Sequence, residues 1–284
     1  MTDETEIGAL SPLEEEVLKD LRKANLSDAE RKRLLKQIQN PEIKRGNRIK
    51  RQYPSRRFRV GIISDWHVGN KNFRKDVFED SVKEFNKQKV DEIYHIGDVI
   101  EGMSNREGHI YELDIPGVSG QLDVAVDLLK QYRQPITGIL GNHDLWAMKK
   151  ANQGVDVGNE LENRVNGMTM IGHLYGDIEI NPKTSIRLSH EGSSAYALSY
   201  SLQKRINSLS GGDKPSVIFN GHLHKALYMF YRNVHAVEAA TFESQTEFMK
   251  MKGSPAHVGF WIADIHYNKN GVTRFTPTFY PYYD

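Results

Sequence analysis

From Phe58 onward, short apolar runs alternate with amphipathic stretches along the chain. The short runs favour strands and the stretches with helical spacing favour helices. In chain order, this part predicts a strand at Phe58–Ser64, a helix at Lys75–Lys87, a strand at Glu92–Ile96, a helix at Gln121–Tyr132 and a strand at Pro135–Leu140. Such alternation is typical of an α/β sheet with helices on its faces.

The remaining part of the chain continues with more strands than helices. The expected elements are strands at Thr184–Leu188, Ser216–Phe219, Ala226–Tyr231 and Val258–Tyr267, with a helix at Ala195–Ile206. Because α/β domains often reach about 200–250 residues without splitting, we expect one large domain over residues 58–284.

Residues 1–43 have a different pattern and predict a helical N-terminal appendage. Ser11-Pro12-Leu13-Glu14 and Ser27-Asp28-Ala29-Glu30 are capping boxes, and each precedes a stripe of leucine, isoleucine or valine at helical spacing. Two short helices cannot form a stable core alone. They are expected to pack on the main domain, on a protein partner or on a second copy in a homodimer, and a DNA-binding helix-turn-helix is an alternative.

Residues 44–57 predict a basic linker. The chain as a whole has a net charge of only +1, yet eight basic and no acidic residues lie between positions 44 and 59: Lys44, Arg45, Arg48, Lys50, Arg51, Arg56, Arg57 and Arg59. Such a run can follow a phosphate backbone, which makes Arg56, Arg57 and Arg59 candidate substrate-binding residues. A solvated linker with no ligand explains the same run equally well.

The composition limits the chemistry. The chain has no cysteine and 11 histidines, so disulfides, thiolate nucleophiles and cysteine-based zinc sites are excluded, and metal binding must use His, Asp, Glu and Asn. No apolar run approaches the roughly 18 residues of a membrane span, and the acidic start is unlike a signal peptide. We expect an intracellular, cytoplasmic protein that does not enter the membrane.

Polar residues with ligand chemistry follow five of the predicted strands directly. These motifs are Asp65-Trp66-His67, Gly97-Asp98, Gly141-Asn142-His143-Asp144, His190 and Gly221-His222-Leu223-His224. In an open α/β sheet, ligands bind at the carboxyl ends of the strands. Any one of these motifs alone is a common cap or turn, whereas five in the same position relative to a strand indicate a site.

This set of donors suits two divalent cations. Imidazole combined with carboxylate and amide oxygen favours Mn, Fe, Zn or Ni over Mg or Ca. Two such ions, about 3.5–4 Å apart, can activate a water and neutralise charge on phosphoryl oxygens, and a nearby histidine can protonate the leaving oxygen. The pattern therefore predicts hydrolysis of a phosphate ester, with manganese as the expected metal.

In their order along the chain, the five motifs resemble those of the calcineurin-like metallophosphoesterases. The resemblance implies an α/β fold of two packed mixed β-sheets flanked by helices. Carried over residue by residue, it assigns the first metal to Asp65, His67 and His224, the second to Asn142, His190 and His222, and the bridging position to Asp98. It also implies that His143 is the acid that protonates the leaving group and that Asp144 orients it.

Two departures from the family pattern refine this resemblance. Val99-Ile100-Glu101-Gly102 and Asp144 replace the Asp-Arg-Gly continuation and the Glu of Ser/Thr protein phosphatases, which argues against that branch. Glu191 separates His190 from Gly192 where the family usually has His-Gly, so His173 is a rival for this ligand. An alternating strand leads into His190, and we therefore favour it.

Two further stretches are similar to nucleases of the family. Asp65-Trp66-His67-Val68-Gly69 has the Asp-x-His-x-Gly form of phosphodiesterase-type members, including double-strand-break repair nucleases. The segment from Thr241 to Phe248 is similar to one in the small, exonuclease subunit of archaeal D-family DNA polymerase. Because this chain lacks room for that subunit's oligonucleotide-binding domain, we expect a stand-alone relative.

The expected function is a two-metal phosphodiesterase that acts on DNA as an exonuclease. The stretch between Gly102 and Gly120 supplies Arg106, His109 and Tyr111 as candidate substrate contacts, and bases could stack on Tyr228, Phe230, Tyr231 or the terminal Tyr280-Pro281-Tyr282-Tyr283. One alternative is a phosphatase or phosphodiesterase for a small nucleotide, including a cyclic one. Another is a non-catalytic interaction subunit, against which the complete ligand set argues.

Overall fold

The computed structural model describes residues 47–104, 106–148, 154–192, 197–210 and 212–283. The chain divides into two units between Arg45 and Gly46, and the description below concerns the second unit. The helical appendage expected at residues 1–43, with its role in binding a partner or a second copy, lies outside the described residues, as do Lys44 and Arg45.

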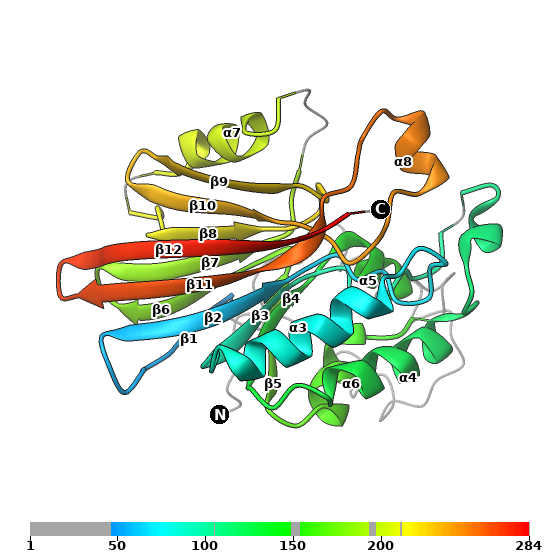
Figure 1. Ribbon diagram of the computed structural model, residues 1–284, viewed down its shortest axis with the longest axis horizontal. Helices are drawn as coiled ribbons and strands as arrows, with labels where there is room; N and C mark the ends of the chain where they lie inside the picture. Colours follow the sequence, from blue (N-terminus) through cyan, green and yellow to red (C-terminus); the bar gives the residue numbers. More distant parts are fainter. Residues whose placement is uncertain (1–46, 105, 149–153, 193–196, 211, 284) are drawn as a thin grey trace, which may run out of the picture. The chain divides into compact units, whose positions relative to one another are not determined.

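Two mixed six-stranded β-sheets lie in layers, flanked by helices (Figure 1). The first sheet has the strand order β12 (Gly271–Tyr282), β11 (Val258–Asn268), β2 (Arg57–Ile63), β3 (Glu92–Ile96), β4 (Ile136–Leu140) and β5 (Met168–His173). The second has the order β1 (Arg48–Lys50), β6 (Tyr175–Asn181), β7 (Thr184–Ser189), β8 (Val217–Asn220), β10 (Val234–Ala239) and β9 (Ala226–Tyr231). The fold class predicted from the sequence is confirmed.

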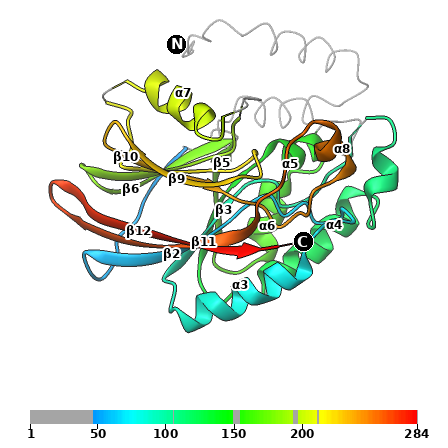
Figure 2. The ribbon, with the colours of Figure 1, turned by 45° about the horizontal axis from the view of Figure 1, so that its top comes forward.

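Helices cover the outer face of the first sheet because each has one apolar side. These helices are α3 (Lys75–Lys87), α4 (Val118–Leu129) and α6 (Val157–Arg164). In α3, Val77, Phe78 and Phe85 recur at helical spacing and are buried against the sheet. On the other side of the molecule, α7 (Tyr200–Ser208) covers the second sheet through Leu202 and Ile206 (Figure 2).

A second apolar layer fills the space between the two sheets. Along β2, Phe58, Val60 and Ile62 point into this layer, whereas Ile63 packs on the helix side. Every residue of β3 and β4 is buried, as expected for central parallel strands covered on both faces. The two layers hold the carboxyl ends of the strands in fixed relative positions.

Part of the segment predicted as a basic linker joins the second sheet. Arg48–Lys50 forms β1, which pairs in parallel with β6. Arg51 then donates from Nε to Glu92 Oε1 at 3.2 Å and from Nη2 to Thr137 Oγ1 at 2.9 Å. The Tyr53 hydroxyl donates to Glu92 Oε2 at 2.5 Å. These residues therefore tie the segment to the buried amino ends of β3 and β4.

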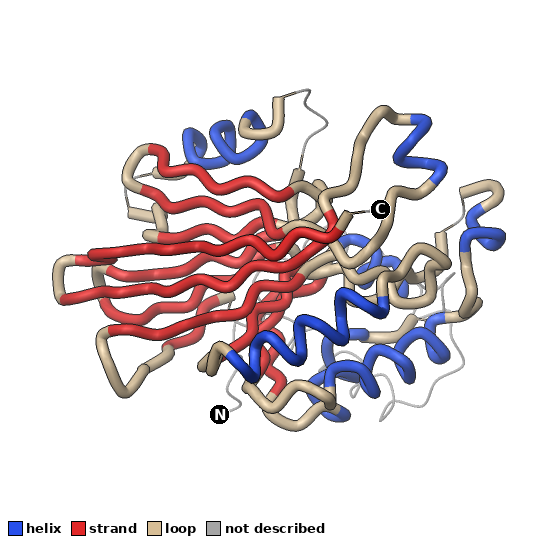
Figure 3. The backbone as a smooth tube through the Cα atoms, in the orientation of Figure 1, coloured by secondary structure: helices blue, strands red, loops and turns tan. Residues whose placement is uncertain are grey.

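Five strands have no counterpart among the predicted elements: β1, β5, β6, β10 and β12. The strand pattern of β12 is interrupted by Pro277 and Pro281, which cannot donate to a ladder. Proline is tolerated there because β12 is an edge strand that pairs only with β11. The tube view shows the long β11–β12 hairpin, whereas helices and longer loops lie between several of the other strands (Figure 3). Among the described residues, none of the helices has the length and the apolar character to span a membrane.

Replacing Arg51 with alanine is expected to lower the free energy of unfolding by about 1–3 kcal/mol, because the carboxylate of Glu92 would stay buried without its cation. The measurement is the midpoint of urea unfolding. Arg56→Ala is the matched control, since Arg56 is exposed and belongs to the same basic run; its effect should stay within about 0.5 kcal/mol. Equal midpoints for the two variants would contradict a structural role for Arg51.

Candidate metal centre

The five ligand motifs meet where the carboxyl ends of strands from both sheets come together. Asp65, Asp98 and Asn142 come just after β2, β3 and β4 of the first sheet, whereas His190 and His222 come just after β7 and β8 of the second. The main chain joins these loops, since Asp65 N–H donates to Gly97 O at 3.0 Å and His222 N–H donates to Asp65 Oδ1 at 3.0 Å. The two sheets thus deliver their ligand-type residues to one place.

The backbone at this place adopts a conformation that L-residues rarely take. Asp65, His67, Asp98, His222 and His224 all have positive φ, between 49° and 79°. Left-handed geometry at a residue other than glycine costs roughly 1–2 kcal/mol and persists only where the surroundings enforce it. Five strained residues in one cluster indicate that the fold aims these side chains at a common point.

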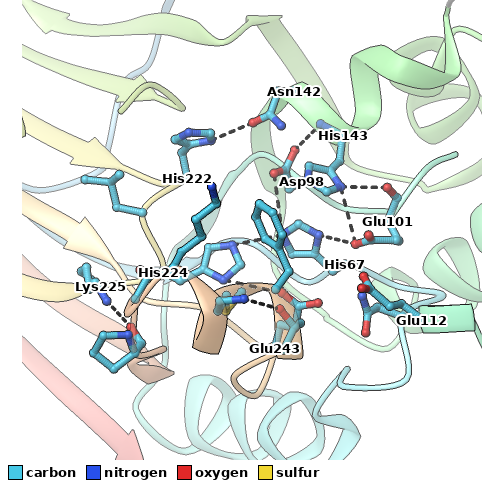
Figure 4. Close-up of a pocket in the computed structure, with 18 of the residues that line it drawn as sticks. His67, Asp98, Glu101, Glu112, Asn142, His143, His222, His224, Lys225 and Glu243 are labelled. Carbon is cyan, nitrogen blue, oxygen red and sulfur yellow. Dashed lines mark hydrogen bonds and ion pairs between the residues drawn. The ribbon is translucent and has the colours of Figure 1, made fainter. Parts of the chain in front are cut away.

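Asp65, His67 and His224 form the first cluster. Figure 4 shows the two histidines of this cluster side by side. His67 Nε2 lies 3.1 Å from His224 Nε2, and His224 Nε2 lies 3.2 Å from Asp65 Oδ1. The Nδ1 of His67 lies 2.6 Å from Glu101 Oε2, so this nitrogen carries the proton that the carboxylate accepts. The lone pair of a neutral His67 is then on Nε2, which faces the cluster.

Asp98, His190 and His222 form the second cluster, and Asn142 joins it. His190 Nε2 lies 3.0 Å from Asp98 Oδ2, while its Nδ1 donates to Ile96 O at 2.6 Å. His222 Nδ1 lies 2.7 Å from Asn142 Oδ1. Asp98 also lies 3.7 Å from His67 Nε2 of the first cluster, so its carboxylate stands between the two clusters.

The spacing and the donor types fit two metal ions. With metal–ligand bonds near 2.0–2.2 Å, neighbouring ligand atoms of one ion are about 3–3.5 Å apart, close to the separations in both clusters. In His67 and in His190, Nε2 faces the cluster and Nδ1 donates a hydrogen bond to an oxygen on the other side. Hydrogen bonds of this kind orient histidine ligands in metalloproteins. The residues that would hold the two ions are therefore Asp65, His67 and His224, then Asn142, His190 and His222, with Asp98 shared.

The buried charges in the two clusters compensate one another. Burial alone would raise the pKa of Asp65 and Asp98, but the neighbouring histidines outweigh burial and hold both pKa values below the ordinary range. Burial would lower the pKa of His190, yet Asp98 and Asp65 outweigh it and raise that pKa to about 9. Each of these carboxylates is therefore held in its charged form by the neighbouring imidazoles.

His143 lies beside the clusters, where a general acid is expected. Its backbone N–H donates to Asp98 Oδ1 at 2.8 Å, and its Nδ1 donates to the carbonyl oxygen of Glu101 at 2.8 Å. Its ring packs on Trp146 with 3.9 Å between the ring centroids. Burial lowers the pKa of His143, but the charges of Asp98 and Glu101 together outweigh it and the net pKa is raised.

Asp144 makes hydrogen bonds to the main chain on either side of the metal-ligand loops. Its Oδ1 accepts from Ile100 N–H at 3.1 Å and its Oδ2 accepts from Gly141 N–H at 2.9 Å, so it fixes the main chain at the start of α5 (Asn142–Ala147). The imidazole of His143 is bonded through Nδ1 to the carbonyl oxygen of Glu101. Burial, reinforced by the charge of Asp98, raises the pKa of Asp144 to about 6.

Two buried glutamates beside the metal ligands were not predicted as site residues. Glu101 contacts His67 through Oε2 and His109 Nε2 through Oε1, the latter at 2.7 Å. Glu243 Oε2 lies 3.6 Å from His224 Nδ1 (Figure 4). Each glutamate thus lies behind one ligand of the first cluster. In the sequence they follow Gly97-Asp98 and Thr241-Phe242, but only the folded loops bring them to the histidines.

A cavity of about 1010 Å³ opens over the two clusters. Arg106 and His109, two of the predicted substrate-binding residues, line it. Tyr111 is 79% exposed and is not part of its lining. His173 ends β5 and belongs to neither cluster, whereas His190 lies in the second one.

The predicted contacts of Arg57 and Arg59 with substrate have no support in the structure. Both arginines lie at the amino end of β2, about 20 Å along the strand from Asp65. There Arg57 and Arg59 bind the carboxylate of Asp264 at 3.0 and 2.9 Å. Arg56 is exposed just before this strand and is equally remote from the cavity.

The aromatic residues proposed for base stacking also lie elsewhere. Tyr228, Phe230 and Tyr231 belong to β9, an edge strand, and none of them lines the cavity. Tyr280 and Tyr282 belong to β12 and donate to Glu84 and Asp80 of α3. In the part of the chain that the structure describes, the aromatic rings that line the cavity, apart from the histidines, are Trp146 and Phe248.

Curated relatives of this chain are subunits of a DNA polymerase. The chain is 26% identical over 234 residues to the DNA polymerase II small subunit of Pyrococcus furiosus, covering 67% of this chain and 38% of that protein. It is also 26% identical over 241 residues to the subunit of Methanothermobacter thermautotrophicus, covering 68% of this chain and 49% of that protein. The chain therefore spans less than half the length of either relative.

Solved structures of phosphoesterases are similar at low sequence identity. An archaeal phosphodiesterase covers 78% of this chain and 100% of its own, with 14% identity and a TM-score of 0.45. A phosphoesterase from E. coli covers 77% of this chain and 98% of its own, with 13% identity and a TM-score of 0.42.

The family model of the calcineurin-like phosphoesterases matches residues 58–226. This match includes more than half of the chain and contains all five ligand motifs, from Asp65 to His224. The chain belongs to the calcineurin-like phosphoesterase family.

Proposed function

We propose that this chain is a two-metal phosphodiesterase that hydrolyses phosphodiester bonds in nucleic acid, with DNA exonuclease activity as the expected form. The observation that carries the proposal is the convergence of two ligand clusters, joined by Asp98, under a cavity that His143 also lines. A decayed site would have lost members of this set. Manganese is the expected metal, and iron, zinc and nickel suit the same donors.

The catalytic roles follow from the positions of the side chains. A pair of divalent cations supplies an activated water and stabilises charge on the phosphoryl oxygens. His143 uses Nδ1 to bind the Glu101 carbonyl, which leaves Nε2 as the nitrogen that can give a proton to the leaving oxygen. Trp146 packs against the ring, so the direction of Nε2 is fixed before the substrate binds.

Two features of this chain bear on the substrate. The relatives named as DNA polymerase II small subunits favour nucleic acid. The cavity favours a short substrate, because the loops around Arg106 and Phe248 form its walls. The basic residues Arg57 and Arg59 pair with Asp264 and do not extend the cavity. A phosphodiesterase or phosphatase for a small, including cyclic, nucleotide is therefore the second candidate. A non-catalytic subunit is the third, since the relatives are subunits.

The test of this proposal is hydrolysis by the purified full chain loaded with Mn²⁺. The substrates are end-labelled single- and double-stranded DNA, a cyclic nucleotide, bis-p-nitrophenyl phosphate and p-nitrophenyl phosphate. We expect metal-dependent shortening of DNA that stops on chelation, and the retained label gives the direction. Turnover of the small substrates with intact DNA would support the second candidate, and no turnover on any of them would support the third.

His143→Ala is expected to lower kcat by about 10²–10⁴ with little change in metal affinity, because the side chain lies beside the ligands and contributes a proton. Metal affinity is measured from the rise in melting temperature on Mn²⁺ titration. The matched comparison is His190→Ala, which removes a ligand of the second cluster and should reduce both kcat and the Mn²⁺ response. Full activity of His143→Ala would remove this residue from the acid role.

Glu101→Gln is expected to weaken Mn²⁺ binding by about 10–100-fold, because the carboxylate that accepts the His67 Nδ1 proton would be lost. Glutamine keeps the size of the side chain, so the core is unchanged. Glu107→Gln serves as the control, since Glu107 is exposed in the same stretch. An unaltered Mn²⁺ titration of Glu101→Gln, measured by isothermal calorimetry, would show that His67 is held without Glu101.

A further inference from the structure

The cavity over the metal centre has a flat aromatic surface on one wall. Phe248 lies in α8 (Glu247–Met251), lines the cavity and is 40% exposed. The guanidinium carbon of Arg106 lies 4.9 Å from the centroid of its ring, and Lys252 Nζ lies 5.7 Å from it. These three side chains, Phe248, Arg106 and Lys252, are called the aromatic–basic wall below.

The Phe248 ring is displayed to the cavity and is not part of the core. None of the residues of α8 is buried. The helix is held from its ends: Thr246 Oγ1 accepts from Met249 N–H at 3.1 Å, and Gln245 Nε2 donates to Ser254 O at 3.2 Å. Since an exposed phenylalanine contributes little to folding, its position in a cavity above a metal centre points to a ligand.

Arg106 is fixed in place by a second interaction. Both of its terminal nitrogens donate to the carboxylate of Glu112, at 3.0 and 2.5 Å. A bidentate pair of this kind sets the plane of the guanidinium. The wall therefore offers two flat surfaces, one aromatic and one cationic, on which a planar group can stack.

The rest of the lining also exceeds what a phosphate group requires. Apolar residues that line the cavity include Trp146, Leu198, Leu223, Phe248, Met249 and Pro255. Its volume is at the upper end of the roughly 300–1000 Å³ of small-molecule sites. A phosphate alone would meet only the metal ligands and the cations, so the apolar surface must contact an organic group of the substrate.

We propose that Phe248 is the stacking platform for a nucleobase next to the scissile phosphodiester, and that Arg106 and Lys252 hold the base and its neighbouring phosphate. This subsite rests on the proposed function, because it assumes that the ester is nucleotidyl. A nucleobase has a flat π-face that suits the ring and the guanidinium together, and stacking of this kind accepts any base. The platform makes the site favour a substrate with a base over one with phosphates alone.

The test compares two labelled probes of the same length, oligothymidylate and an abasic oligonucleotide. Binding is measured by fluorescence anisotropy with Mn²⁺ in a His143→Ala background, where we expect cleavage to be slow. Phe248→Ala should weaken oligothymidylate binding roughly 5- to 150-fold and leave abasic binding unchanged. Phe248→Trp should keep the preference for bases.

Two controls separate stacking from a fault in the fold or the metal centre. Met251→Ala removes another exposed apolar side chain of α8 that does not line the cavity, and it should not alter binding. The rise in melting temperature with Mn²⁺ should be the same in all of these variants. Thymidine monophosphate and ribose 5-phosphate are each added as competitors of the labelled oligothymidylate. Stronger competition by thymidine monophosphate would show that a free nucleotide, and not only a polymer, can supply the base.

The outcomes are distinct. A base preference that disappears in Phe248→Ala, for the oligonucleotide or for the mononucleotide, supports the platform. Equal binding of both oligonucleotides, unchanged in Phe248→Ala, overturns the platform and leaves the nuclease proposal standing. Binding of none of these probes, together with turnover of small aryl esters, overturns the platform and the nucleotidyl substrate together.

Discussion

Asp65 and Asp98 are almost fully buried, and their carboxylates lie among imidazoles and not in water. A buried charge costs several kcal/mol unless a partner of opposite charge and hydrogen bonds compensate it. The partners of these two carboxylates come from strands of both sheets, so the clusters form only when the sheets are packed in register. Folding and assembly of the site are therefore one event. The same requirement explains why the protein tolerates positive φ at both residues.

The glycines that precede the ligands make this convergence sterically feasible. Gly97 has φ of 88°, and a Cβ there would lie 2.7 Å from Gly141 N. A Cβ on Gly141 would collide with the carboxylate of Asp98. The recurring Gly-Asp, Gly-Asn and Gly-His pairs thus reflect close approach of three loops, each needed to place the next residue. The strand ends, the glycines and the positive-φ ligands together fix the positions of the ligand side chains.

The sequence was sufficient for the elements that carry the ligands, because buried central strands are continuous apolar runs and each ligand follows one directly. It was insufficient where contacts are made by loops. Glu101, Glu243 and Phe248 reach the site through turns whose path no periodicity encodes. The charge of the basic run also does not reveal its position: Arg59 is six residues from Asp65 in the sequence, yet it pairs with Asp264 at the opposite end of the strand. Asp144 likewise binds backbone, although it is adjacent to the histidine it was expected to orient.

The two ligand clusters bear on the reaction, whereas the aromatic–basic wall bears on the substrate. The clusters come from strand ends that the fold fixes, so they specify a reaction on phosphate esters and say little about what the phosphate is attached to. The wall comes from Arg106, which is exposed, and from α8, none of whose residues is buried in the core. If the wall binds the substrate as proposed, substrate choice depends on side chains that contribute little to the stability of the chain. Because reaction and substrate binding depend on different residues, the same type of metal centre can act on different esters. The structural support for a nucleotidyl substrate therefore comes from the aromatic–basic wall and not from the ligand clusters.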